Sequence, residues 1–171
     1  MMFDLDLKIR DICINSIEKD DLNSIHEWIN TQKSFLDKKN KPFSLKDVYE
    51  MFLQYYVGEG ELFLKIEQCS EIIGIIKGRI EFKNPNEIWI LCFFLEEPKR
   101  SKGIGSDIIN EIMEYFICRC GINKFYSITL PKNKEYLKFW LKNGFEVSRI
   151  TNNFINIERW DEKLFILSNE K

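Results

Sequence analysis

The stretch that decides the fold leads from an expected strand into an expected helix and reads Leu95-Glu96-Glu97-Pro98-Lys99-Arg100-Ser101-Lys102-Gly103-Ile104-Gly105-Ser106. Backbone N–H groups in the first turn of a helix have no partner inside the helix, and the helix dipole adds partial positive charge there. Gly103 and Gly105 carry no side chain that would keep a phosphate away from that backbone, and Arg100 and Lys102 add positive charge. The stretch predicts a diphosphate site, although a plain turn and helix start remains an alternative.

Two other nucleotide-binding patterns fit this stretch less well. A dinucleotide-binding fingerprint needs a third glycine, which would fall at Ile108, and it follows an early strand of a βαβ unit. A P-loop ends in Gly-Lys-Ser or Gly-Lys-Thr, and this stretch contains neither.

A second segment, Asn133-x-x-Tyr136-x-x-Phe139-Trp140-x-x-x-Gly144-Phe145, follows after one further helix and strand. Together with Arg100-x-x-Gly103-x-Gly105, it resembles the two motifs of the GNAT superfamily of acetyl-CoA-dependent N-acetyltransferases. The acetyl-CoA signature of that family is Arg/Gln-x-x-Gly-x-Gly/Ala, and its other motif has Asn, a small residue, an aromatic pair and Gly-Phe. The resemblance is clearest over residues 87–150. It implies one α+β domain over residues 1–171, with a mixed, mostly antiparallel sheet of about six to seven strands and about four helices.

The resemblance also implies a binding site for the co-substrate acetyl-CoA and for no metal. Backbone groups at the end of one strand pair with pantetheine, backbone amides at the start of the next helix bind the diphosphate, and an Asn contacts the pantetheine arm. Carried onto this chain, the expected cofactor-binding residues are Phe93, Leu95, Arg100, Ser101, Lys102, Gly103, Ile104, Gly105, Ser106 and Asn133.

Three positions depart from the family pattern. Pro98 lies two residues before Arg100 where the family often has proline three before it, and Tyr136 replaces a small residue. Trp140 replaces the tyrosine often assigned as general acid to the leaving thiolate. A thiol has a reference pKa of about 8.5, so its anion leaves acceptably near neutral pH without that acid. We expect Trp140 to form an apolar wall beside the thioester, with Tyr136 or Tyr126 as candidate acids.

The acceptor amine needs a base, because an amine with a pKa of about 10.4 is almost fully protonated at pH 7. Glu87 begins the strand that ends at Leu95 and, by strand alternation, shares a face with Phe93, so it is the candidate base. A solvated glutamate at a strand start is the alternative. Glu59 and Glu61 are candidates for holding a cationic substrate, with a solvated loop as the alternative. The expected catalytic residues are Glu87, Trp140 and Tyr136.

Composition narrows the class of protein further. The chain has 171 residues, 44% hydrophobic and 30% charged, with a net charge of -2, which fits one globular domain and disfavours nucleic acid as a partner. No apolar run is long enough to span a membrane, and the N-terminal segment lacks the pattern of a signal peptide. We therefore expect a cytoplasmic protein without a membrane or nucleic-acid partner. The chain lacks alanine and is rich in Ile, Lys, Asn and Phe, which suggests an AT-rich genome, and we expect a bacterial source. Cys13, Cys69, Cys92, Cys118 and Cys120 are expected to be buried free thiols.

Apolar spacing predicts the order strand, two helices, three strands, helix, strand, helix and two strands. The strands are expected at about 9–15, 61–67, 71–82, 87–95, 124–130, 145–155 and 162–168. The first helix begins near Asp20 or Asp21, the second is capped by Ser44 with Asp47, and the third runs from Ile104 to Gly121. The last helix, capped by Asn133, is expected to turn Leu137, Trp140 and Leu141 inward. The segment 33–42 is expected to be a loop, and His26 to have a structural role.

The sequence favours an enzyme that moves an acetyl group from acetyl-CoA to a primary amine by direct attack on the thioester. The acceptor is expected to be a small-molecule or peptide amine, and a homodimer is possible. The alternative from another class is a non-catalytic acetyl-CoA sensor or scaffold, which Trp140 favours.

Overall fold

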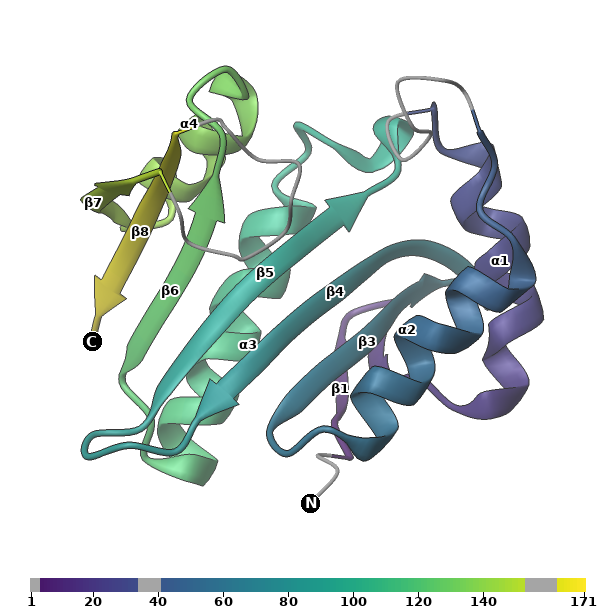
Figure 1. Cartoon of the computed structure of the whole chain (residues 1–171), viewed down its shortest axis with the longest axis horizontal. Coiled ribbons are helices and arrows are strands. Elements are labelled where there is room, and N and C mark those ends of the chain that lie inside the picture. Colours follow the sequence, from purple (N-terminus) through teal and green to yellow (C-terminus); the bar gives the residue numbers. More distant parts are fainter. Residues whose placement is uncertain (1–3, 34–40, 153–162) are drawn as a thin grey trace. The chain divides into compact units, whose positions relative to one another are not determined.

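The computed structural model describes residues 4–33, 41–152 and 163–171. The chain divides into two compact units, Met1–Gly78 with Phe93–Arg100, and Arg79–Cys92 with Ser101–Lys171. In the described residues, eight strands follow one another in the order β1-β2-β3-β4-β5-β6-β8-β7, and four α-helices connect them (Figure 1). The expected mixed, mostly antiparallel α+β fold is confirmed, with one more strand than the upper number expected from the sequence.

The extra strand comes from a hairpin at the start of the first unit. We expected one strand at about 9–15, and this was wrong: β1 (Asp6–Ile9) and β2 (Ile12–Ser16) pair antiparallel. The turn between them places Arg10 at φ 55°, a left-handed conformation in which a residue other than glycine is uncommon. β2 then pairs antiparallel with β3 (Glu61–Gln68).

Helices α1 (Leu22–Thr31) and α2 (Leu45–Val57) pack together in the first unit, and α2 contacts β3 (Figure 1). Each helix buries one apolar stripe, and Met51 of α2 is partly buried beside its stripe. Ser44 and Asp47 form the predicted capping box, because the Ser44 hydroxyl accepts from the Asp47 N–H and the Asp47 carboxylate accepts from the Ser44 N–H. The buried stripes consist of Leu22, Ile25, Trp28, Ile29, Val48, Phe52 and Tyr55.

His26 has a structural contact, as the sequence indicated. Its Nε2 lies 2.9 Å from the backbone carbonyl oxygen of Phe43, and the Asn30 side chain binds both the N–H and the carbonyl of the same residue. These contacts hold the approach to α2 against α1. Most of the expected loop 33–42 lies outside the described residues.

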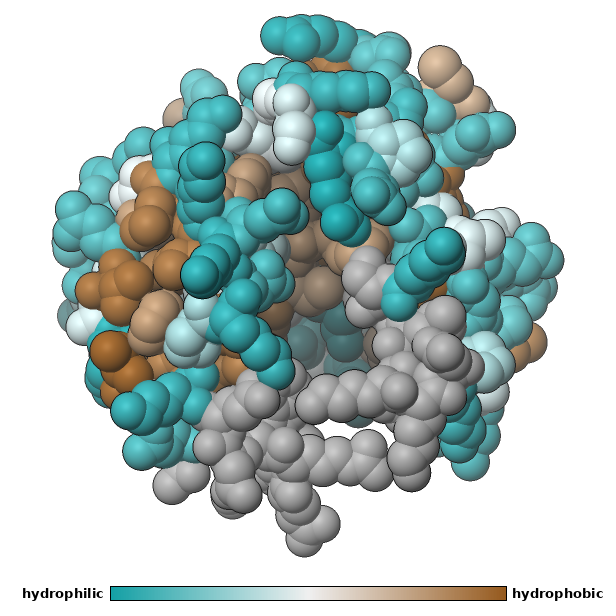
Figure 2. Space-filling view, turned by 90° about the horizontal axis from the view of Figure 1, so that it is seen from above, coloured by the Kyte–Doolittle hydropathy of each residue, from teal (hydrophilic) through white to brown (hydrophobic). Residues whose placement is uncertain are grey.

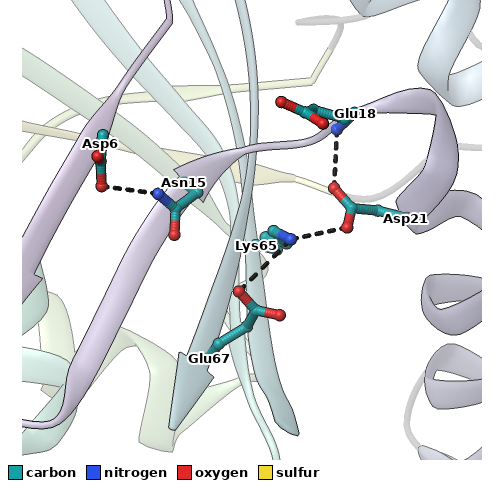
Figure 3. A network of polar contacts seen from close by, with 6 residues as sticks. All are labelled: Asp6, Asn15, Glu18, Asp21, Lys65 and Glu67. Atoms are coloured by element: carbon teal, nitrogen blue, oxygen red, sulfur yellow. Dashed lines mark hydrogen bonds and ion pairs between the residues drawn. The ribbon is translucent and has the colours of Figure 1, made fainter. Parts of the chain in front are cut away.

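Lys65 ties the start of α1 to the sheet of the first unit. Its ammonium lies 2.7 Å from an Asp21 carboxylate oxygen and 3.4 Å from one of Glu67 (Figure 3). Burial alone would lower the pKa of Lys65, but the hydrogen bonds and charges of Asp21 and Glu67 outweigh it, so the pKa is raised. The other Asp21 oxygen accepts from the Glu18 N–H at 2.8 Å, which completes the helix start.

Strands β4 (Glu71–Glu81) and β5 (Glu87–Leu95) agree closely with the sequence prediction. Cys69 and Ser70, at φ 52° and 65°, form the turn between β3 and β4. In the second unit, β5 pairs in parallel with β6 (Lys124–Thr129) over Glu87–Ile90 and Lys124–Ser127.

Helix α3 (Ile104–Cys120) buries one apolar face in the core of the second unit and ends, as predicted, at Gly121. The N–H of Gly121, a residue at φ 64°, donates to Ile117, which closes the helix end. The buried side chains of this helix are Ile108, Ile109, Ile112, Met113 and Phe116.

After β6, α4 (Lys134–Lys142) leads to β7 (Glu146–Thr151) and β8 (Leu164–Glu170), which pair antiparallel. Trp140 is buried as predicted, but the inward prediction for Leu141 was wrong, because 46% of it is exposed. Val147 and Ile150 of β7 are also exposed, and Figure 2 shows apolar atoms at the surface on the side where α4 and β7 lie in Figure 1. Residues 153–162, which include the end of the strand expected at 145–155, lie outside the described part.

The five cysteines all lie in the described residues and form no disulfide, but the prediction that they are buried was wrong. Cys69 and Cys118 are exposed, and Cys13, Cys92 and Cys120 are partly exposed. Burial still raises the pKa of the Cys120 thiol. Within the described parts of the chain, no helix has the length and apolar character that crossing a membrane requires.

Candidate functional site

The start of α3 has the backbone geometry that anion binding needs. Gly103 is the N-cap at φ 81°, and its carbonyl accepts the first helical hydrogen bond, from the Asp107 N–H at 3.0 Å. The N–H groups of Ile104, Gly105 and Ser106 precede that bond and so have no partner within the helix. A Cβ added at Gly103 would meet nothing within 4 Å. Packing therefore does not demand glycine here, whereas the left-handed backbone does.

The segment before Gly103 bends sharply. Glu97–Lys99 forms a short 3-10 helix, with Pro98 in its first turn, where a missing N–H costs nothing. This turn accommodates the proline that departs from the family spacing. Ser101 follows at φ 58°, so the chain reaches α3 through two left-handed residues, Ser101 and Gly103.

Arg100 belongs to the first unit and contacts the end of β5. Its Nε donates to the carbonyl of Leu95 at 2.7 Å, and its guanidinium carbon lies 4.7 Å from the centre of the Phe94 ring. Phe93 and Leu95 are both buried. The expected cofactor residues thus occur in both units: Phe93, Leu95 and Arg100 in the first, and Ser101, Lys102, Gly103, Ile104, Gly105, Ser106 and Asn133 in the second.

Asn133 caps α4, as the sequence indicated. Its Oδ1 accepts from the Tyr136 N–H at 3.2 Å, so the side-chain amide group is the part of Asn133 that a ligand would use as a donor. The capping bond also fixes the first turn of α4, which carries Tyr136.

Trp140 and Tyr136, two expected catalytic residues, lie together on α4. The rings meet edge to face at 5.7 Å, and Trp140 also packs against Phe139 and Phe145 at 5.2 and 4.7 Å. The exposed fraction of Trp140 is 0%, whereas Tyr136 is partly exposed. The buried indole therefore packs against the Tyr136 ring, and of these two residues only Tyr136 is exposed at the surface.

Glu87, the expected base, is part of an ion-pair cluster at the start of β5. Lys83 lies 2.6 Å from a Glu81 oxygen and 2.9 Å from a Glu87 oxygen, and these hydrogen bonds raise the pKa of Lys83. Because a strand rises about 3.3 Å per residue, Glu87 lies at the opposite end of β5 from Leu95. A role for Glu87 as base therefore requires a substrate that reaches this end and displaces the lysine.

Tyr126 lies beside Trp89 on the neighbouring strand. The two residues are register partners of β5 and β6, and their rings stack at 4.5 Å with an interplanar angle of 14°. Trp89 is buried and Tyr126 is partly exposed. Glu59 and Glu61 follow α2 in the first unit, where Glu59 is exposed and Glu61 partly so.

Gly74 is a further residue of interest that the sequence reasoning did not single out. A Cβ at this position of β4 would lie 2.5 Å from the Phe94 carbonyl oxygen and 2.8 Å from a Leu95 methyl carbon. A glycine in the interior of a strand is itself a signal of close approach by another backbone. Here that backbone is the end of β5.

Solved structures with the same fold are described as acetyltransferases. The microcin C7 self-immunity acetyltransferase MccE, in complex with acetyl-CoA and AMP, aligns with a TM-score of 0.81 and 18% identity, covering 95% of this chain and 94% of that one. The ribosomal L7/L12 α-N-protein acetyltransferase RimL, in complex with coenzyme A, aligns at 0.78 and 15%, covering 95% of each chain. The spermidine N-acetyltransferase of Vibrio cholerae, with CoA and spermine, aligns at 0.74 and 15%, covering 95% and 96%.

These structural alignments show the fold, and a match of the sequence to a family model shows the family. Residues 14–162 match the acetyltransferase (GNAT) domain family, which covers most of the chain. A search of curated proteins finds no match. The protein belongs to the GNAT acetyltransferase family, and its class is that of the acyltransferases.

Proposed function

We propose that the protein transfers the acetyl group of acetyl-CoA to a primary amine of a small molecule or peptide in the cytoplasm. The observation that carries the proposal is the left-handed Gly103, which leads into a helix start with open first-turn N–H groups. It stands inside the motif Arg100-x-x-Gly103-x-Gly105 of a GNAT family member. Neighbours of the same fold were solved with acetyl-CoA or CoA.

In the proposed reaction the amine nitrogen attacks the thioester carbonyl carbon directly. A C–N bond forms, the C–S bond breaks, and the electron pair of that bond leaves on the CoA sulfur. The amine loses one proton to a base and the thiolate gains one from an acid or from water. The reaction needs no covalent enzyme intermediate, and no cysteine lies within either motif.

The roles of individual side chains follow from their surroundings. First-turn amides of α3 would bind the diphosphate, and Phe93, Leu95 and Asn133 the pantetheine arm. Tyr136 is partly exposed and carries a hydroxyl, and its ring packs against Trp140. It is therefore a better candidate than the buried Trp140 for protonating the thiolate. Glu87 is retained as the candidate base, on condition that the amine displaces Lys83.

A screen of primary amines with acetyl-CoA tests the proposal. The panel should include polyamines, peptides with free N-termini and amino-acid metabolites, with thiol release and product mass as the two measurements. We expect amine-dependent release of one CoA thiol per acetylated product. Binding of acetyl-CoA without thiol release for any amine would favour the sensor or scaffold function, for which the replacement of the family tyrosine by Trp140 is the supporting observation.

A further inference from the structure

The last residues of β5 have a defined backbone orientation in the first unit. The Glu96 N–H donates to the Ile73 carbonyl of β4 at 2.9 Å. Because backbone groups alternate between the two sides of a strand, those of Leu95 and Phe93 point away from β4. These are the two residues whose backbone is expected to pair with pantetheine.

Arg100 is held against this strand end by two different contacts. Its Nε–H donates to the Leu95 carbonyl at 2.7 Å, and its guanidinium lies over the Phe94 ring. The Phe94 ring in turn meets Trp28 of α1 edge to face at 5.9 Å. The short 3-10 turn makes this possible, because the Arg100 N–H donates to the Glu97 carbonyl and so returns the side chain along β5.

The opposite side of the strand end is confined as well. Gly74 lets β4 approach so closely that any side chain there would press on the Phe94 carbonyl and the Leu95 side chain. Its φ is not in the left-handed region, so the backbone conformation does not require glycine, and close approach is the remaining reason. Arg100 and Gly74 therefore fix the same two residues from two sides.

We propose that Arg100 is a positioning residue for the pantetheine arm of acetyl-CoA, acting through the Leu95 carbonyl and the Phe94 ring. It does not serve as a charge for the diphosphate. By binding the last outward-facing carbonyl of β5, it sets where an extended ligand can begin to pair with the strand. The inference rests on the proposed function, since it assumes that an acetyl thioester binds along β5.

Three substitutions separate the planar guanidinium from the charge. Arg100→Met removes both. Arg100→Lys keeps the charge and an ammonium donor but loses the planar Nε–H group that stacks on Phe94, and Arg100→Gln keeps a planar amide donor without charge. Each variant is compared with wild type for kcat/KM with acetyl-CoA and with S-acetyl-pantetheine, which lacks the diphosphate. We expect Arg100→Met and Arg100→Lys to lose about tenfold or more with both thioesters, the size of one charge-assisted hydrogen bond, and Arg100→Gln to regain part of the loss.

If Arg100 instead binds the diphosphate through its charge, the opposite pattern is expected. Arg100→Lys would then be close to wild type, Arg100→Gln would be as poor as Arg100→Met, and no loss would appear with S-acetyl-pantetheine. The loss would also shrink as salt is raised, because salt screens an exposed charge. Either this pattern or wild-type behaviour of Arg100→Met overturns the inference. Because Arg100 is exposed, these variants are expected to fold, which circular dichroism checks.

Gly74→Ala provides an independent test from the other side of the strand. We expect it to lower kcat/KM with both thioesters, because the added methyl displaces Phe94 and Leu95. Unchanged kinetics in Gly74→Ala would contradict the role of this strand end. If the wild-type protein neither binds acetyl-CoA nor releases thiol, the proposed function itself fails. If the wild type is active and only the variants behave otherwise than expected, the inference alone fails.

Discussion

Glu81 and Glu87 hold the same ammonium group, that of Lys83, at 2.6 and 2.9 Å, yet only Glu87 is a candidate base. The pair therefore supplies a matched test. We expect Glu87→Gln to lower the amine-dependent rate near pH 7 by about 10- to 10³-fold, with acetyl-CoA affinity almost unchanged, because a base acts on the acceptor's proton. The loss should shrink as the pH approaches the pKa of the free amine, because a larger fraction of the amine is then neutral in solution without help from a base. Steady-state kinetics across about pH 6 to 9 measure it.

Glu81→Gln is the control, because it also removes one partner of Lys83 but no candidate base. It should leave the rate close to wild type. Equal losses in the two variants would assign the effect to the ion-pair cluster as a whole. Wild-type rates in both variants would show that Glu87 is not the base, and that a water chain or another carboxylate takes up the proton.

Trp140 offers a second test at the residue scale. Its ring is fully buried against Tyr136 and Phe145, so it has no surface of its own to offer a thioester. Trp140→Phe should keep most of the turnover while lowering the free energy of unfolding by about 1–3 kcal/mol, because the smaller ring leaves a cavity. Urea unfolding and kcat measure the two effects. A fall in kcat of about 10³-fold or more, with unchanged acetyl-CoA affinity, would show that the indole takes part in the chemistry.

Helix α3 carries a left-handed glycine at each end, Gly103 at φ 81° and Gly121 at φ 64°, and both face open space. A valine at either position pays a similar cost for the left-handed backbone, about 1–2 kcal/mol. Gly103→Val should abolish acetyl-CoA binding, because its side chain would occupy the place expected for the diphosphate. Gly121→Val should bind like wild type at a similar loss of stability. Calorimetric titration of both variants measures the difference, and equal binding would overturn the site assignment.

The sequence predicted best those elements whose spacing of apolar residues, caps and turn residues agrees with their burial in the fold. Strand β5 and the capping box of α2 had such signals, and both are confirmed. The β1–β2 hairpin was missed because its turn uses Arg10 in a conformation that usually signals glycine. Leu141 has helical spacing with Leu137, four residues before it, but it is exposed, because tertiary packing decides which face of α4 turns inward.

The candidate site was predictable in part for a similar reason. Gly103 at the start of α3 has a local conformational cause, its positive φ, and a glycine directly before a helix indicates such a conformation in the sequence. The contact of Arg100 with Leu95, the ion pairs of Lys83 and the close approach at Gly74 depend on side chains and strands that meet only in the fold. Sequence spacing assigned Arg100 a charge role, whereas its contacts with Leu95 and Phe94 support the positioning role proposed above.

At the scale of the whole molecule, the expected cofactor residues are divided between the two compact units. We predicted one domain over residues 1–171, and such a domain should unfold in a single cooperative transition. Acetyl-CoA at about 100 times its Kd should stabilise the folded state by about 2.7 kcal/mol, because it binds that state alone. For a chain of this size, that corresponds to a rise in Tm of about 5–10 °C. Scanning calorimetry with and without the ligand measures both the number of transitions and the shift.

The two glycine variants of α3 make this measurement specific. Gly121→Val should start from a lower Tm than wild type but show the same rise with acetyl-CoA, whereas Gly103→Val should start equally low and show none. If residues 1–171 form a single domain, the protein must shift as one transition. Two transitions, of which acetyl-CoA moves only one, would contradict the single domain and would identify the unit that holds the ligand.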